Sequence, residues 1–150
     1  MKLAEALTLR ADLQKRIAQL RVRLNANSKI QEGDTPAEEP KELLEELNRN
    51  ILEYEELIRR INYTNCNVEE DGMTLTDMIA KRDTMSLKLS ILRDFLAQAS
   101  EKVNRYSNNE IKIVSTVNVR EMQKQIDKES KELRELDTKI QGINWTRDLM

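Results

Sequence analysis

The chain has 150 residues, of which 35% are charged and only 3% are aromatic, with three glycines, two prolines and a formal net charge of −2. This composition favours one domain of long helices with aliphatic faces over a β-sandwich or an α/β sheet. The absence of histidine excludes histidine metal sites and serine or cysteine triads, and three isolated glycines exclude a glycine-rich phosphate loop. We therefore expect no cofactor, no metal and no catalytic residues.

Charge is distributed unevenly along the chain. Residues 1–29 contain seven Lys or Arg and two Asp or Glu, a net charge of +5, whereas residues 30–71 contain four and thirteen, a net charge of −9. Opposite charge on two consecutive helices favours their lying side by side, although an exposed ion pair contributes only about 0.2–1 kcal/mol. Because the chain is acidic overall and poor in aromatic residues, we interpret the pattern as helix pairing and expect no nucleic-acid partner.

The first helix is predicted over residues 2–27, where apolar residues recur at a spacing of three and four. Gly33, Pro36 and Pro40 interrupt this pattern and predict a loop. The apolar stripe of the first helix consists of Leu3, Ala6, Leu13, Ile17, Leu20 and Leu24.

The second helix is predicted over residues 40–64, because Pro40 in a first turn loses no backbone hydrogen bond. Asp71 and Gly72 then form a turn signal, and Thr74 with Asp77 resembles a capping box for the next helix. The predicted apolar stripe of the second helix consists of Leu44, Leu47, Ile51, Tyr54, Ile58 and Ile61.

Two further helices are predicted over residues 74–106 and 118–142, the second with Asn118 as its cap and Gly142 at its end. The stripe of the third helix consists of Leu75, Met78, Met85, Leu89, Leu92, Leu96, Ala99, Val103 and Tyr106. The stripe of the fourth consists of Val119, Met122, Ile126, Leu133, Leu136, Ile140 and Ile143.

One segment resembles a strand. Residues 110–117, EIKIVSTV, are rich in β-branched residues that alternate in polarity. In an up-down-up-down bundle, the loops after the first and third helices lie at the same end, so this segment can pair with residues around Ile30. We therefore predict an all-α fold, an antiparallel up-down-up-down bundle of four long amphipathic helices in a single domain over residues 1–150, with a small two-stranded β cap. Pairing of the strand between two molecules is the alternative.

Three charged residues stand where the heptad pattern predicts apolar ones, namely Arg10, Arg82 and Glu129. A helical rise of about 1.5 Å per residue places Arg10 and Glu129 within about one turn of each other, so we expect an ion pair between them. A buried charge without a partner is strongly unfavourable, and Arg82 therefore indicates a second polar layer. The predicted buried polar network consists of Arg10, Glu129, Arg82, Glu5, Tyr54, Asn62 and Asn65.

The lone cysteine, Cys66, excludes an intramolecular disulfide framework and fits a reducing compartment. The first residues carry charges where a signal peptide needs an apolar run, and no segment approaches the roughly 18 apolar residues of a spanning helix. We expect a cytoplasmic protein.

The segments LAEALTLRADLQKRI, QEGDTPAEEP, INYTN, DGMTLTDMIAKRD, YSNNEIKIVSTV and INWTRDL follow one another along the chain. In this order they resemble the septicolysin-like family of small bacterial proteins over nearly the whole sequence. The resemblance implies a compact helical protein of bacterial origin and supplies no catalytic residues. The family name implies a cytolysin-like, membrane-active protein.

The function that we predict is non-enzymatic association, with the protein itself as partner in a homo-oligomer. A second apolar stripe on an amphipathic helix either widens the core or forms an interface. The alternatives are membrane lysis and the binding of an anion or small ligand at the polar layers. Apolar residues outside the predicted stripes are Leu7, Leu9, Val22, Leu43, Leu52, Leu57, Leu87 and Ile91.

Overall fold

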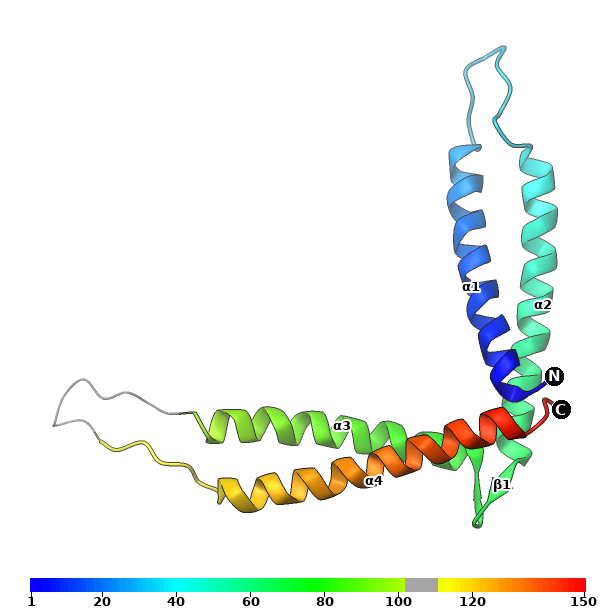
Figure 1. The fold of residues 1–150 in the computed structure, drawn as a ribbon. Helices are drawn as coiled ribbons and strands as arrows, with labels where there is room; N and C mark the ends of the chain where they lie inside the picture. Colours follow the sequence, from blue (N-terminus) through cyan, green and yellow to red (C-terminus); the bar gives the residue numbers. More distant parts are fainter. Residues whose placement is uncertain (102–110) are drawn as a thin grey trace. The chain divides into compact units, whose positions relative to one another are not determined.

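The structure, a computed structural model, describes residues 1–101 and 111–150. It is mostly helical, with four helices and one small antiparallel sheet among these residues, which confirms the predicted helical class (Figure 1). In chain order the elements are α1 (Leu3–Ala26), α2 (Pro40–Asn67), β1 (Glu69–Glu70), β2 (Met73–Thr74), α3 (Leu75–Ala99) and α4 (Val119–Thr146).

The helix ends depart from the predicted ones mainly in α3 and α4. Helix α3 ends at Ala99, and the predicted continuation over residues 102–106 lies outside the described residues. Helix α4 passes through Gly142, where we predicted its end, because a helical glycine costs only about 1 kcal/mol and the next residue, Ile143, is buried. Within the described ranges, none of the helices has the length and apolar character needed to cross a membrane.

The predicted β cap is wrong, because the sheet forms elsewhere. Strands β1 and β2 pair antiparallel around Asp71 and Gly72, which have φ of 53° and 76°. Two successive positive φ values are typical of the type I′ turn that closes a two-residue hairpin. Residues around Ile30 and residues 111–117 form no strand, and residue 110 lies outside the described part. Closing a two-residue loop costs far less entropy than pairing segments about 80 residues apart.

The described residues divide into two compact units. Unit 1 consists of residues 1–75 and 141–150, and unit 2 consists of residues 76–140. In unit 1, α1 and α2 lie side by side and run in opposite directions (Figure 1). In unit 2, α3 and the greater part of α4 form a second antiparallel pair (Figure 1).

The core of unit 1 lies between α1 and α2. The predicted stripe of α1 is confirmed, since Leu3, Leu13 and Leu20 are almost fully buried. The stripe of α2 is displaced by one residue from the predicted one, because Leu44 and Ile51 remain 50% and 43% exposed. The buried positions of α2 and its C-cap are Leu43, Asn50, Leu57, Ile61, Thr64 and Val68, and Leu47, Tyr54 and Ile58 of the predicted stripe are half-buried.

The ends of the described chain pair with each other in unit 1. Leu3 N donates to Arg147 O at 3.0 Å, and Leu149 N donates to Met1 O at 2.9 Å. The hydroxyl of Thr64, which is fully buried, accepts a hydrogen bond from the backbone N–H of Met150 at 2.9 Å. This contact gives the polar side chain in the α2 stripe a partner, as burial requires.

The core of unit 2 lies between α3 and α4. Leu89, Leu96 and Ile126 are buried together, and half-buried apolar residues surround them. The predicted stripes of these two helices therefore face each other. The surrounding residues are Leu92, Val119, Met122 and Leu133.

The displaced stripe of α2 can be tested with a matched pair of substitutions. We expect Leu57→Ala to lower the free energy of unfolding by about 2–4 kcal/mol, because it leaves a cavity in the core of unit 1. Ile51→Ala, on the open face of the same helix, should cost less than about 1 kcal/mol. Urea denaturation followed by circular dichroism measures both, and a larger loss for Ile51→Ala would show that α2 presents its other face to α1.

Candidate functional site

The structure divides the predicted polar network between the two units. Arg82 and Glu129 belong to unit 2. The other five residues belong to unit 1. Those five are Glu5, Arg10, Tyr54, Asn62 and Asn65.

Glu129 is half-buried on α4 and has two partners within unit 2. Its carboxylate accepts hydrogen bonds from Lys88 Nζ at 2.8 Å and from Gln125 Nε2 at 3.2 Å. The bond from Lys88 holds the pKa of Glu129 below its ordinary value. These contacts lie within unit 2, whereas Arg10 belongs to unit 1, so the ion pair between Arg10 and Glu129 stays a prediction.

Arg82 joins the two helices of unit 2. Its guanidinium donates to Asp83 Oδ1 at 2.8 and 2.9 Å, and its Nη1 lies 3.7 Å from Asp137 Oδ1 on α4. Two carboxylates thus compensate one cation. An adjoining hollow of about 530 Å³ between α3 and α4 contains Arg93 and Arg134.

Charge in this hollow between α3 and α4 is also close to balanced. Arg93 Nη2 donates to Ser130 Oγ at 2.9 Å, and Asp127 lies in the same hollow as Arg93 and Arg134. Leu96 and Ile126 contribute apolar surface. A site for a small anion needs an excess of donors or positive charge, and one net cation in an open groove supplies little of either. This groove is therefore a weaker candidate for a binding site than the exposed apolar face of α3.

The five network residues of unit 1 lie in different local environments. Glu5 is exposed and accepts a hydrogen bond from the backbone N–H of Lys2 at 2.7 Å, at the start of α1. Tyr54 OH accepts one from Gln14 Nε2 at 2.6 Å, which joins α2 to α1. Arg10 is half-buried, and its Nε is buried without a hydrogen-bond partner among the described residues. Asn62 is exposed and Asn65 half-buried.

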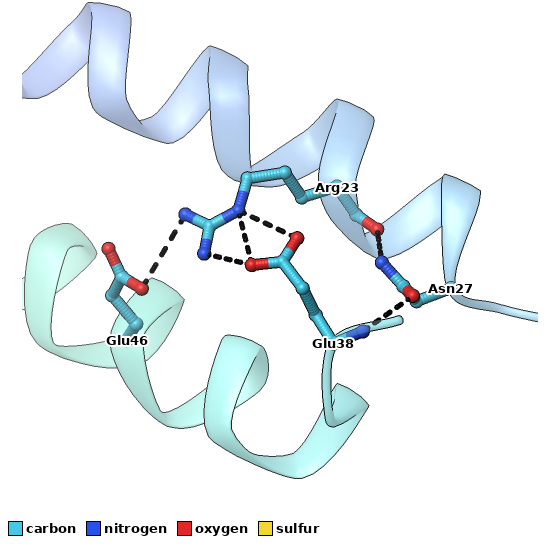
Figure 2. Close-up of polar contacts among 4 residues, drawn as sticks. All are labelled: Arg23, Asn27, Glu38 and Glu46. Carbon is cyan, nitrogen blue, oxygen red and sulfur yellow. Dashed lines mark hydrogen bonds and ion pairs between the residues drawn. The ribbon is translucent and has the colours of Figure 1, made fainter. Parts of the chain in front are cut away.

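A polar cluster that the sequence analysis missed closes the loop between α1 and α2 (Figure 2). Arg23 Nε lies 3.1 Å from both carboxylate oxygens of Glu38, and Arg23 Nη1 lies 3.7 Å from Glu46. Asn27, which is buried, donates to Arg23 O at 2.9 Å and accepts from Glu38 N at 3.0 Å. The signal for this cluster was the opposite charge of the first two helices, and their predicted side-by-side pairing is confirmed.

The clearest surface feature is an apolar face of α3, which we call the α3 stripe and define as Leu87, Ile91 and Phe95. These side chains are 64%, 59% and 43% exposed. They are spaced four residues apart, so they form one ridge along the helix. Leu89 and Leu96, which pack against α4, lie on roughly the opposite side of α3.

The exposed apolar surface continues beyond α3 within unit 2. Phe95 borders a hollow of about 290 Å³ together with Ile113 and Val114, which are also exposed. Single exposed apolar residues are normal, but a contiguous patch of them marks a surface that associates. Among the described residues, no group of three or more acidic or cysteine side chains is placed to hold a metal ion.

The unpaired Nε of Arg10 predicts that this residue destabilises unit 1. A buried hydrogen-bond donor without a partner costs about 1–3 kcal/mol. The substitution Arg10→Met removes this donor and retains an unbranched apolar side chain in its place. We expect the free energy of unfolding, measured by urea denaturation, to rise by about 1 kcal/mol. The control is Arg16→Met on the exposed surface of α1, which should change stability little. A loss of stability with Arg10→Met would mean that Arg10 has a partner in solution.

The contact between Arg23 and Glu38 predicts a dependence of stability on pH. The hydrogen bond from Arg23 holds the pKa of Glu38 below its ordinary value of 4.5. A lowered folded-state pKa contributes stability above the unfolded pKa, and this contribution is lost as the pH falls through the folded pKa. We therefore expect Glu38→Gln to be less stable than the wild type at pH 7 and to lose less stability on acidification to about pH 3.

Urea denaturation at both pH values checks this prediction. The control is Glu53→Gln, on the exposed surface of α2, which should follow the wild type at each pH. Equal losses on acidification for Glu38→Gln and the wild type would mean that the contact does not contribute in solution.

Comparison with known proteins places the chain in a family without assigning an activity. The crystal structure of a functionally unknown conserved protein from Corynebacterium diphtheriae is 42% identical in sequence and superposes with a TM-score of 0.89, over 100% of this chain and 99% of that chain. No curated protein matches. The predicted resemblance to the septicolysin-like family is wrong, because neither the similar crystal structure nor the matching family model belongs to that family. The cytolytic activity that the family name implied therefore loses its basis. Since residues 10–149 match it, the chain belongs to the family of unknown function DUF6847.

Proposed function

We propose that this protein is a non-enzymatic assembly protein that associates with further copies of itself through the α3 stripe. The observation that carries the proposal is that α3 is apolar on two faces, while α4 covers one of them. A second apolar face on a helix is typical of a surface that associates with another molecule. A second copy supplies the missing cover.

The size of the open stripe favours association over chance exposure. Full burial of one large aliphatic or aromatic side chain is worth about 1.5–3 kcal/mol relative to leaving it exposed. Three half-exposed side chains on one ridge therefore leave a few kcal/mol of burial unrealised in each copy. A gain of this size, made twice in a symmetric pair, can offset much of the entropy that two molecules lose on association.

Helix α4, which pairs with α3 in unit 2, has only one apolar face. Helix α4 is strongly amphipathic, and its large apolar residues between 119 and 140 are buried or half-buried. Its outward face is polar or charged, as is usual for a solvent-exposed helix. In the described part of unit 2, the exposed apolar surface is thus on α3 and on the adjoining segment with Ile113 and Val114.

Three finer predictions of the sequence belong to the same proposal. These are a single domain over residues 1–150, an up-down-up-down arrangement of all four helices, and a cytoplasmic location, which the lone Cys66 favours. Binding of an anion between α3 and α4 is the weaker alternative, because carboxylates compensate most of the arginine charge there.

The test is size-exclusion chromatography with multi-angle light scattering on the full chain. We expect a discrete oligomer for the wild type at micromolar concentration and a monomer for the double variant Leu87→Glu/Ile91→Glu, because two charges cannot be buried in the apolar contact. Circular dichroism should show unchanged helix content, since both side chains are exposed.

The matched control is Val22→Glu/Leu52→Glu in unit 1. These two apolar residues are as exposed as Leu87 and Ile91, but they lie outside the α3 stripe. The control should remain an oligomer. A wild type that is strictly monomeric, or a control that dissociates as fully as the stripe variant, would contradict the proposal.

A further inference from the structure

The α3 stripe has a geometry that suits packing against an identical ridge, an inference that rests on the proposed self-association. Leu87, Ile91 and Phe95 follow the i, i+4, i+8 row of the helix. When such rows of two helices interdigitate, the helices cross at about 50°, which is the commonest packing class in globular proteins. Both helices then contribute the same kind of row, so a two-fold pair of identical copies satisfies the packing.

The two edges of the α3 stripe carry opposite charge. A rotation of about 100° per residue places Lys81 and Lys88 along one edge, about 60–80° from Ile91. The same rotation places Asp83 and Asp94 along the other edge, at about the same angle in the opposite sense. We call these the basic edge and the acidic edge. All four side chains are exposed.

On each edge one of the two charged side chains already has an internal contact, but it remains largely exposed. Lys88 Nζ lies 2.8 Å from Glu129 Oε1, yet 58% of the Lys88 side chain is exposed. Asp83 is bonded to Arg82, and 62% of its side chain is exposed. Both groups can therefore take part in a second contact without leaving the first.

Symmetry decides which edges meet. If the two-fold axis runs roughly along the α3 helices, the helices point the same way and the basic edge of each copy faces the acidic edge of the other. If the axis runs across the helices, they point in opposite ways, and each edge faces its own counterpart. The first arrangement brings Lys88 of one copy toward Asp94 of the other, and the second brings like charges together.

We propose that two copies pair through their α3 stripes about such a lengthwise two-fold axis, with the helices pointing the same way and crossing near Ile91. The apolar ridge supplies the affinity, and the charged edges select the direction. Exposed pairs are individually weak, but like charges across an interface act against the alternative, so the sign of the charge suffices to choose between two otherwise similar packings.

Single-cysteine crosslinking tests the direction. In the full chain with Cys66→Ser, Leu87→Cys and Phe95→Cys are made separately and treated with a short bis-maleimide, and the products are resolved by denaturing electrophoresis. Leu87 and Phe95 are about 12 Å apart along the helix. In the proposed pair each residue lies near its own counterpart, so each variant alone should form a crosslinked dimer. Val22→Cys, exposed in unit 1, is the control and should not crosslink.

Each outcome decides between the proposals. Crosslinking only when the Leu87→Cys and Phe95→Cys proteins are mixed would overturn the lengthwise axis and leave the self-association intact. An oligomer in light scattering without crosslinking at either position would overturn the pairing through the α3 stripe. A monomeric wild type would overturn the proposed function itself.

A charge variant gives an independent measurement. Asp94→Lys places a cation opposite Lys88 in the proposed pair, so the dissociation constant from dilution light scattering should rise by about fivefold. In the opposite direction of packing, Asp94 already faces Asp94, and its replacement should leave the constant nearly unchanged. An unchanged constant would therefore contradict the proposal.

Discussion

A pair of antiparallel helices can bury only one face of each member, and this constraint governs the rest of the structure. Helix α4 meets it, since its apolar residues in unit 2 form one stripe against α3. Helix α3 does not, because it carries Leu87, Ile91 and Phe95 on a second face. The hydrophobic effect is proportional to the area removed from water, so the surplus face is a driving force that the pair itself cannot use. The association that we propose would bury this surplus face.

The same constraint explains how α2 is oriented. Its sequence contains two overlapping patterns of three and four that share Leu47, Tyr54 and Ile61. One pattern is purely apolar, and the other contains Asn50 and Thr64; the structure buries the second. Thr64 finds a backbone partner in Met150, which offsets the cost of its burial. A polar residue such as Asn50 within an apolar stripe is a known means of fixing register, which the purely apolar pattern lacks.

Features that depend on neighbouring residues in the sequence could be predicted, whereas features that depend on contacts between helices could not. The stripes of α1 and α3 and the turn at Asp71 and Gly72 depend on neighbours within a few residues, and they were visible in the sequence. The rotation of α2 and the partners of Glu129 depend on which helices meet. Arg23 and Glu38 were predictable only in part. The opposite charge of their segments predicted that the two helices pair, but it did not predict which side chains form the contact.

Charge and apolar contact have different tasks in this protein. Arg23 joins α1 to Glu38 in the loop before α2, and Lys88 joins α3 to Glu129 on α4, with side chains that remain partly exposed. Surface ion pairs are too weak to hold helices together, but each is lost when a helix rotates or reverses. The apolar stripes therefore supply the stability of both helical pairs, and the charges determine which faces and directions are compatible with it. The same arrangement recurs on the surface of α3, where the exposed apolar ridge of Leu87, Ile91 and Phe95 lies between a basic edge and an acidic edge.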